Sequence, residues 1–355
     1  MAGEQEALER IDAYRRRRPT LKDETITLAH GAGGKASAAL VAAVFIEAFG
    51  QPNPDELGDS AILRVPAGRI AYSTDSYVVN PIRFPGGSIG DLAVNGTVND
   101  LAVSGAQPKW LSAAFVIEEG LPVDELRAIA ADMRAAADKA GVRIVTGDTK
   151  VVPRGAADKV FITTSGIGLI PDGREFGAHL VQAGDRILVS SSIADHGMAV
   201  MLARGNLALE ADIKSDSAPV NGAVEALLAA APQVRWMRDA TRGGLGTVTN
   251  ELAQASGLSV VLDDEALPVK PVVRGACDML GIDPLYVANE GCFIAVIPAA
   301  LAQAGLRALR DAGWTQAALV GEIVSDPPQI VVVRNTFGGT RLVDMMVGDP
   351  LPRIC

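Results

Sequence analysis

Aspartate residues stand beside small or polar residues in four short motifs, where we expect strands and helices to begin or end. The motifs are Gly58-Asp59-Ser60-Ala61, Ser73-Thr74-Asp75-Ser76, Val98-Asn99-Asp100-Leu101-Ala102 and Arg238-Asp239-Ala240-Thr241-Arg242-Gly243-Gly244-Leu245. A magnesium ion that acts on a nucleoside triphosphate takes one or two carboxylates together with phosphate oxygens and water. Any single aspartate could instead cap a helix or close a turn. The set as a whole predicts a magnesium–nucleotide site.

A glycine loop, His30-Gly31-Ala32-Gly33-Gly34, precedes an alanine-rich segment, Lys35 to Phe49, whose apolar spacing predicts a helix. Backbone amides at the start of a helix can hold an anion such as a phosphate. The same glycines could serve only to make a tight turn. The loop is therefore a candidate phosphate site that needs support from other motifs.

Two further motifs offer groups that could move protons. Gly147-Asp148-Thr149-Lys150 follows a predicted strand as a short loop with a carboxylate, a hydroxyl and an ammonium group, which suits a polyphosphate or a proton transfer. A plain surface turn is the alternative. Asn289-Glu290-Gly291 places a carboxylate at the entry of the apolar strand Cys292 to Ile297. Taken alone, that carboxylate has a structural interpretation.

The chain ends in Pro350-Leu351-Pro352-Arg353-Ile354-Cys355. Its two prolines exclude a helix and remove two sheet donors, so we expect an extended, flexible arm that can reach a distant cleft. The adjacent α-carboxylate disfavours the Cys355 thiolate, so any reactivity must come from the site that the arm enters. Lys150 and Glu290 are the candidates to supply it. Alternatively, Cys355 is only a frayed chain end.

Composition bounds the class of protein. The 355 residues suggest two domains at about 150 residues each. A content of 48% apolar and 21% charged residues is typical of a globular enzyme, and a net charge of −10 argues against nucleic acid as a partner. We find no apolar run of the roughly 20 residues that span a bilayer and no secretory signal, so no membrane association is expected. Arg15 to Arg18 read as a solvated extension.

Cysteine and histidine usage points to a reducing compartment without transition-metal catalysis. Cys277, Cys292 and Cys355 form no paired framework, and we expect Cys277 and Cys292 to be core thiols. The three histidines are too dispersed for a zinc site. The expected location is the cytoplasm.

The elements that must position these motifs form an α+β chain with no βαβ repeat and no P-loop. The predicted first lobe contains strands at Ala61–Val65, Arg69–Ser73, Trp110–Ile117, Val142–Val145 and Lys159–Ile167, an amphipathic helix at Ser88–Ser104 and a helix at Val123–Ala140. The predicted second lobe contains strands at Arg186–Val189, Val260–Leu262, Phe293–Ile297 and Ile330–Val333, with helices near Met198, Val224, Leu252 and Leu306. A boundary falls at Pro171-Asp172-Gly173. The expected parts are an extension (1–24), an N-terminal nucleotide-binding and dimerisation domain (25–170), a C-terminal domain (171–338) and a flexible tail (339–355).

From about residue 25 to its end, the chain resembles the HypE family of hydrogenase maturation factors. The resemblance rests on His30–Gly34, Thr74-Asp75-Ser76-Tyr77-Val78-Val79, Phe84-Pro85-Gly86-Gly87, Asn99–Ala102, Gly147–Lys150 and the terminal Pro352-Arg353-Ile354-Cys355. The aspartate motifs are more distantly similar to those of aminoimidazole ribonucleotide synthetase and selenophosphate synthetase, which lack this tail. Asn80 and Arg83 depart from the family, which often has an acidic and an aromatic residue there.

The resemblance implies a two-domain aminoimidazole ribonucleotide synthetase-like fold, α/β mixed, that dimerises through its N-terminal sheets and binds ATP between its lobes. It implies that Asp59, Asp100 and Asp239 hold Mg²⁺ with the phosphates. The full set expected to bind the nucleotide is Gly31, Gly33, Gly34, Asp59, Asp75, Asn99, Asp100, Asp148, Thr149 and Asp239.

The resemblance also implies a reaction. A carbamoyltransferase, HypF, loads Cys355 with a carbamoyl group, and ATP-dependent dehydration turns that group into a thiocyanate. The cyanide then passes through a HypC–HypD scaffold complex to the iron of a nickel–iron hydrogenase. Lys150 and Glu290 are the expected proton carriers, because a base must lie within hydrogen-bond reach of the amide.

Two other readings remain open from the residues alone. The chain could be a small-molecule ATP-dependent synthetase of the selenophosphate or aminoimidazole ribonucleotide type, for which Cys355 is incidental; ATP hydrolysis that depends on selenide or on a ribonucleotide identifies it. The chain could also be a non-catalytic thiol carrier, which would not hydrolyse MgATP. Repeated aspartate motifs argue against a passive carrier.

Overall fold

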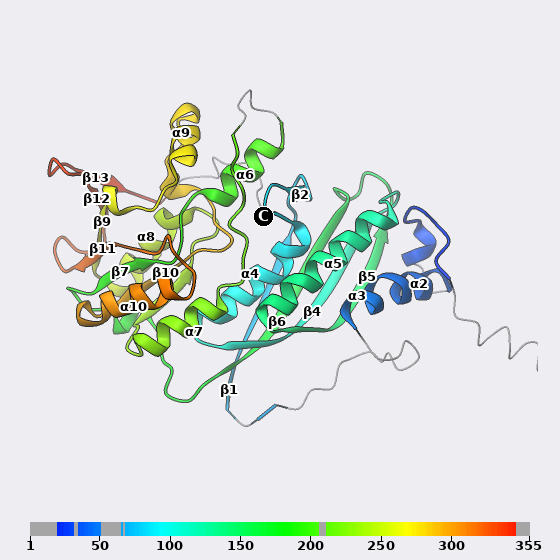
Figure 1. The fold of residues 1–355 in the computed structure, drawn as a ribbon, viewed down its shortest axis with the longest axis horizontal. Helices are drawn as coiled ribbons and strands as arrows, with labels where there is room; N and C mark the ends of the chain where they lie inside the picture. Colours follow the sequence, from blue (N-terminus) through cyan, green and yellow to red (C-terminus); the bar gives the residue numbers. More distant parts are fainter. Residues whose placement is uncertain (1–19, 32–34, 51–64, 67, 206–210, 346–355) are drawn as a thin grey trace, which may run out of the picture.

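The computed structural model describes residues 20–31, 35–50, 65–66, 68–205 and 211–345, which form two lobes joined along one central helix (Figure 1). The N-terminal lobe is built on a four-stranded sheet of order β1-β6-β4-β5, in which only the β4–β5 pair is parallel. Its elements are η1 (Leu28–Gly31), α2 (Lys35–Leu40), the π-helical segment η2 (Val41–Ile46), α3 (Glu47–Phe49), β1 (Arg69–Tyr77), β2 (Arg83–Phe84), β3 (Gly87–Ser88), α4 (Ile89–Val103), β4 (Gln107–Glu118), α5 (Val123–Ala140), β5 (Arg143–Val152) and β6 (Val160–Ile170).

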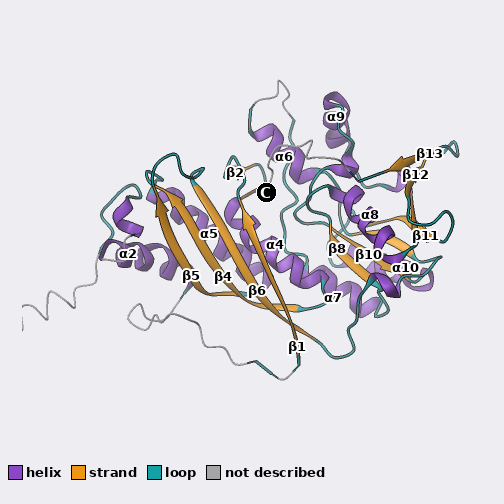
Figure 2. Cartoon of the chain, turned by 180° about the vertical axis from the view of Figure 1, so that it is seen from behind, coloured by secondary structure: helices purple, strands orange, loops and turns teal. Residues whose placement is uncertain are grey.

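Helices α4 and α5 cover one face of this sheet, and Figure 2 shows the four strands in front of them. Side chains alternate along each strand, so Leu111, Phe115 and Ile117 of β4 are buried against the helices. The opposite face carries apolar side chains with no covering element among the described residues. Ile70 and Tyr72 of β1 are 53% and 66% exposed there.

The C-terminal lobe is built on a seven-stranded sheet of order β13-β12-β9-β11-β7-β10-β8. Helix α8 packs on one face, and α7 and α10 pack on the other. Its elements are η4 (Ala178–Leu180), β7 (Arg186–Val189), α6 (Asp195–Ala203), α7 (Asn221–Ala230), β8 (Trp236–Asp239), α8 (Gly244–Ser256), β9 (Ser259–Asp263), η5 (Asp264–Ala266), α9 (Pro271–Leu280), η6 (Pro284–Tyr286), β10 (Phe293–Ile297), α10 (Ala299–Asp311), β11 (Ala318–Val324), β12 (Val331–Arg334) and β13 (Thr340–Val343). Among the described helices, none is long and apolar enough to cross a bilayer.

Helix α4 begins at the capping residue Ser88, whose hydroxyl accepts the Gly90 and Asp91 N–H groups while the Asp91 carboxylate accepts the Ser88 N–H. The prediction that this helix is amphipathic was wrong. It contacts β1 and β6 on one side and α5, α7 and β8 on others, and its polar residues Asn95 and Asn99 are both only 3% exposed. Its polar face is directed at the second lobe. A sequence pattern shows that a helix face is polar, but it does not show whether that face meets water or another part of the protein.

The prediction of a loop at Gly147–Lys150 was also wrong, because these residues lie inside strand β5. Gly147 suggested a turn, but close packing between strands explains why this position is a glycine. A Cβ at this position would lie 2.3 Å from the carbonyl oxygen of Ala113 on the neighbouring strand, so only glycine allows the two backbones to approach.

The expected flexible tail from residue 339 is shorter than predicted. Thr340–Val343 form β13, which pairs with β12, and Val343 is 1% exposed in the core of the lobe. Residues 346–355, including Cys355, lie outside the described residues. Residues 1–19 of the predicted extension also lie outside the described residues. The same holds for the predicted strand at 61–65, of which only Val65 is described.

Helices α4 and α5 and strands β4, β6, β7, β9, β10 and β12 are confirmed within three residues. Strands β1 and β5 run further than predicted, to Tyr77 and Val152, and β2, β3, β8, β11, β13 and α9 were missed. Strand β11 contains Gly321 at a register shift, where a Cβ would lie 2.1 Å from the Val261 carbonyl oxygen. A glycine inside a strand reads as a break in the pattern. Cys277 and Cys292 are buried free thiols, as predicted.

Candidate active site

Asn99 of α4 joins the two lobes. Its side-chain oxygen accepts the Val220 N–H at 2.8 Å, and its amide nitrogen donates to the carbonyl oxygens of Ala218 at 3.1 Å and Glu290 at 3.2 Å. Both amide hydrogens are therefore engaged by the C-terminal lobe. Asn99 therefore joins the two lobes, and its contact with a nucleotide stays a prediction.

Three carboxylates from three elements converge beside this junction. Asp75 comes from β1 and Asp100 from α4, both in the N-terminal lobe, while Asp239 is the last residue of β8 in the other lobe. Ser73 connects the first two elements, because its hydroxyl donates to the Asp100 carboxylate at 2.6 Å. The structure thus brings together three of the sequence-predicted site residues.

The pKa values of these carboxyl groups are raised partly because the groups lie close to one another. Burial, the charge of Asp100 and, to a smaller extent, the charge of Asp75 together raise the pKa of Asp239 to about 7, against the opposing effects of its own backbone N–H and of Arg238. Burial also raises the pKa of Asp100, opposed by the Ser73 hydroxyl and supported by the charge of Asp75. Such a group of mutually repelling carboxylates favours a cation.

Glu290 lies on the same side of the junction and is 4% exposed. Burial raises the pKa of its carboxyl group well above the usual range, and the charges of Asp216, Asp239, Asp75 and Asp100 add to the effect. A carboxyl group of this kind can hold a proton at neutral pH and release it when its surroundings change. Its role as a proton carrier stays a prediction.

Asp216 was missed by the sequence analysis, although it belongs to the motif Ser215-Asp216-Ser217-Ala218 and so resembles the four aspartate motifs that were selected. Its carboxylate accepts the N–H groups of Glu290 at 3.1 Å and Gly291 at 3.0 Å. Burial raises its pKa to about 6. Tyr77, also missed, is buried, and a Cβ at Gly96 would lie 2.2 Å from its hydroxyl oxygen, so glycine is needed beneath it.

The predicted group Asp148, Thr149 and Lys150 lies elsewhere in the protomer. Lys150 pairs with Asp148 at 3.1 Å between Nζ and Oδ2, both side chains are about two-thirds exposed, and the Lys150 hydrogen bond and then the Thr149 N–H lower the pKa of Asp148. Strands in a sheet are about 4.8 Å apart, so β5 runs ~14 Å from β1. The structure does not bring Lys150 to Glu290 within one protomer.

Three glycines of the glycine loop were predicted to bind the nucleotide, and of these the structure describes Gly31. A Cβ there would lie 2.8 Å from the Val151 nitrogen, so η1 packs directly on β5 near Lys150. Gly33, Gly34, Asp59 and Cys355 are outside the described residues, so their predicted roles remain proposals.

The donor set fits a hard divalent cation that is shared with phosphates. Among the described residues, no three histidine, cysteine or acidic side chains are arranged to hold a metal ion alone. Mg²⁺ takes only one or two protein carboxylates when phosphate oxygens complete its shell. Asp100 and Asp239, half-buried and repelling each other, are the residues that would supply such oxygens.

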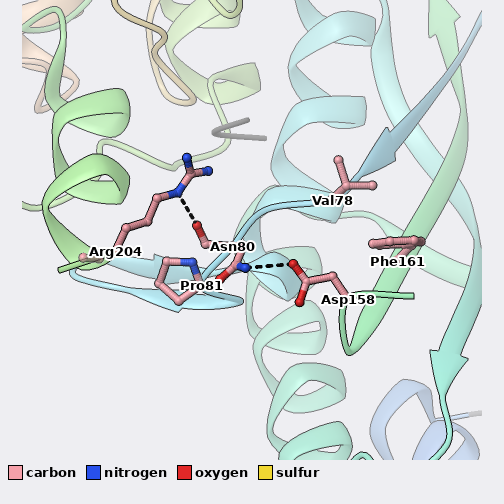
Figure 3. Close-up of a pocket in the computed structure, with 7 residues that line it drawn as sticks. Val78, Asn80, Pro81, Asp158, Phe161 and Arg204 are labelled. Atoms are coloured by element: carbon pink, nitrogen blue, oxygen red, sulfur yellow. Dashed lines mark hydrogen bonds between the residues drawn. The ribbon is translucent and has the colours of Figure 1, made fainter. Parts of the chain in front are cut away.

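A pocket of about 560 Å³ lies where the end of β1 meets α6, as Figure 3 shows. Arg204 Nε donates to the Asn80 carbonyl oxygen at 2.7 Å, and the Asn80 amide donates to the Asp158 carboxylate at 2.8 Å (Figure 3). Val78 and Phe161 add apolar surface. The neutral amide of Asn80 avoids the repulsion that an acidic residue would meet from Asp158, and Arg83 pairs instead with Asp132 at 3.0 Å.

Two family models match this chain, one in each lobe. Residues 57–170 match the family of AIR synthase related proteins, N-terminal domain, and residues 182–334 match the C-terminal domain of the same family. Several solved thiamine monophosphate kinases share the fold at 16–19% identity, with TM-scores of 0.55–0.59. At this identity the likeness concerns the fold alone.

Closer relatives cover nearly the whole chain. Carbamoyl dehydratase HypE of Rhodobacter capsulatus is 52% identical over 94% of this chain and 99% of its own length. Carbamoyl dehydratase HypE of Escherichia coli (strain K12) is 45% identical over 93% and 99%. A crystal structure of HypE in complex with ATP has a TM-score of 0.88 at 45% identity, over 93% of this chain and all of the other. With a two-domain AIR synthase-like fold and this degree of identity, the chain belongs to the HypE family of carbamoyl dehydratases.

Proposed function

We propose that this chain uses ATP to dehydrate an S-carbamoyl group on its own Cys355 to a thiocyanate. The cyanide then becomes a ligand of the iron in a nickel–iron hydrogenase. One observation carries the proposal: Asp75, Asp100 and Asp239 converge beside the buried Glu290 where the lobes meet. The relatives named carbamoyl dehydratase and the HypE structure with bound ATP support the same assignment.

The reaction replaces a poor leaving group by a good one. The carbamoyl oxygen attacks the γ-phosphorus of ATP, ADP leaves, and one amide proton is lost. The C–O bond then breaks, phosphate leaves with that oxygen, and loss of the second amide proton completes the C≡N bond. Two protons must therefore be accepted close to the amide nitrogen, and ordered groups must stabilise the charge on the phosphates.

Asp100 and Asp239 hold Mg²⁺ in this proposal, with Asp59 as a third carboxylate and Asp75 supporting them. The ion, when bound, offsets the negative charge of the phosphates. Gly31, Gly33 and Gly34 supply backbone amides, and Asp148 and Thr149 complete the proposed nucleotide contacts. The raised pKa values of Asp100 and Asp239 support the cation, because binding it removes their repulsion.

In this proposal Glu290, in its ionised form, accepts one amide proton, and the basic phosphate group that leaves with the carbamoyl oxygen accepts the other. The raised pKa of Glu290 suits a group that takes up a proton and returns it. Lys150 lies on the open face of the N-terminal sheet, three strands from β1, so a role in proton transfer requires a site shared with a second protomer.

That second protomer is part of the proposal. The open sheet face presents Ile70 and Tyr72, which a monomer would leave in water, and pairing two such faces buries them. HypF is the proposed loading partner, supported by a solved HypE–HypF complex whose HypE-like chain is 42% identical with a TM-score of 0.76. A HypC–HypD scaffold is the proposed acceptor. The free thiols Cys277 and Cys292 support a reducing compartment, the cytoplasm.

The proposal is tested by single-turnover ATP hydrolysis with the carbamoylated and the unmodified chain. Hydrolysis of one ATP per carbamoyl group is expected, and none without the carbamoyl group. Cys355→Ala should abolish this hydrolysis and retain ATP binding, whereas Asp100→Ala should retain a carbamoylated tail and lose ATP turnover. ATP hydrolysis stimulated by selenide or a ribonucleotide would favour a small-molecule synthetase, and no hydrolysis at all would favour a carrier.

A further inference from the structure

Asp216 forms a two-pronged contact with the turn that carries Glu290. One carboxylate oxygen accepts the Glu290 N–H at 3.1 Å and the other accepts the Gly291 N–H at 3.0 Å. A carboxylate that accepts two adjacent backbone N–H groups fixes the orientation of that peptide more firmly than one neutral acceptor does. The contact therefore determines where the Glu290 side chain leaves the backbone.

Gly291 allows this contact. A Cβ at position 291 would lie 1.9 Å from the Asp216 carbonyl oxygen and 3.1 Å from the Ala218 nitrogen. No side chain fits between the two segments, so the 290–291 turn and the 216–218 segment touch backbone to backbone. Ala218 N–H also reaches the Glu290 carbonyl oxygen at 3.4 Å.

Neighbouring contacts hold the Asp216 segment in place. Ser217 accepts a hydrogen bond from Asn95 of α4 at 3.0 Å, and the Ser215 N–H donates to the Pro85 carbonyl oxygen at 2.8 Å. Asn99, also on α4, donates to the carbonyl oxygens of both Ala218 and Glu290. The segment is thus tied to the N-terminal lobe and holds Glu290 in register with the carboxylates of that lobe.

We infer that Asp216 is the positioning residue for Glu290: its carboxylate, bound to the N–H groups of Glu290 and Gly291, orients the Glu290 carboxyl group toward the reacting amide. The inference rests on the proposed function, since it assigns Asp216 a part in the proton transfer that Glu290 performs. It assigns no direct contact between Asp216 and the substrate.

The charges around Glu290 agree with this arrangement. It is faced by Asp216 from the segment before α7, Asp239 from β8, Asp75 from β1 and Asp100 from α4. Asp216 is first among the charges that raise the Glu290 pKa, after burial itself. Asp216 therefore affects both the place and the charge state of the proton carrier.

The test compares Asp216→Asn with Asp212→Asn, an exposed aspartate in the same segment. Each carbamoylated variant is mixed with saturating MgATP, and the single-turnover rate of thiocyanate formation and the ATP concentration for half-saturation are measured. Loss of the charged acceptor should slow Asp216→Asn by about tenfold or more. Its half-saturating ATP concentration should stay within about twofold of the wild type, and Asp212→Asn should match the wild type.

A double-mutant comparison checks that Asp216 acts through Glu290. In a Glu290→Gln background, Asp216→Asn should slow the residual rate no further. Amide hydrogen exchange at positions 290 and 291 should be faster in Asp216→Asn than in the wild type without ATP. An unchanged rate in Asp216→Asn, or additive losses in the double variant, would overturn the inference. Absence of thiocyanate from the wild type would instead reject the proposed function.

Discussion

The Ser73 hydroxyl donates a 2.6 Å hydrogen bond to the Asp100 carboxylate and so joins strand β1 to helix α4 inside the N-terminal lobe. The bond opposes the burial that raises the Asp100 pKa. Ser73 thereby keeps one carboxylate of the site available as an anion. This contact is a direct link between the fold of the lobe and the charge of the site.

Ser73→Ala should weaken the binding of MgATP. Without the hydroxyl, the Asp100 pKa rises further, so a larger fraction of Asp100 is protonated at neutral pH and proton release must accompany cation binding. We expect a three- to tenfold rise in the dissociation constant at pH 7, about 1 kcal/mol, and a smaller rise at pH 8.5. Calorimetric titration measures both values. Ser76→Ala, on the opposite face of the same strand, is the control and should leave binding unchanged.

Asp239→Asn should stabilise the protein without nucleotide. The folded-state pKa of about 7 lies above the usual value, so the folded state binds more protons than the unfolded state between about pH 4 and pH 7. The stability contributed by protonated Asp239 is therefore fully present below about pH 4 and is lost progressively as the pH rises to about 7. Because the shift is about three pKa units at about 1.4 kcal/mol each, the neutral variant should exceed the wild type by up to about 4 kcal/mol at pH 8 and match it below about pH 4.

Urea unfolding at the two pH values checks this prediction, with EDTA present to remove metal. Addition of MgATP should raise the stability of the wild type and leave that of Asp239→Asn nearly unchanged. A variant that is less stable than the wild type at pH 8, or that gains equally from MgATP, would contradict the assignment of Asp239 to a cation-binding cluster.

Asn99→Ala should destabilise the contact between the lobes. The change leaves the Val220 N–H and the carbonyl oxygens of Ala218 and Glu290 without their partner in a buried setting. We expect the unfolding free energy to fall by about 3 kcal/mol. Asn221→Ala, which removes one inter-lobe hydrogen bond to the Ala140 carbonyl oxygen, should cost about 1 kcal/mol. Equal losses in the two variants would argue against Asn99 as the main joint.

Tyr72→Glu should dissociate the proposed dimer. A charge at this position of the open sheet face would meet the apolar side chains of a second copy and lose its hydration. Sedimentation at micromolar concentration should give a monomer. The control is Phe337→Glu, since Phe337 is 95% exposed on the β12–β13 turn of the other lobe, and this variant should remain dimeric. A monomeric wild type would contradict the dimer directly.

Much of the fold follows from local patterns. Helix α5 was predicted with the bounds that the structure has, Val123–Ala140, because its apolar residues recur at helical spacing between a proline and a glycine. Strands β7 and β10 follow from short apolar runs. The Gly147–Lys150 segment was wrongly predicted as a loop and the strand around Gly321 was missed, because each glycine is required by a neighbouring strand far away in the sequence.

The site was only partly predictable for the same reason. The types of Asp75, Asp100 and Asp239 suggested a cation site, but their convergence depends on how β1, α4 and β8 meet. Asn99 was assigned to the nucleotide from the family resemblance, which could not reveal that its amide also joins the lobes. Asp216 went unnoticed because its significance lies in two backbone N–H groups more than seventy residues away.

The mass of the C-terminal peptide tests the central claim most directly. The carbamoylated chain is incubated with MgATP, digested, and the peptide that ends in Cys355 is weighed by mass spectrometry beside a sample with a non-hydrolysable ATP analogue. We expect the peptide to lose the mass of one water with ATP only, as one ADP and one phosphate form per chain. A carbamoylated peptide of unchanged mass after ATP has been consumed would contradict the claim.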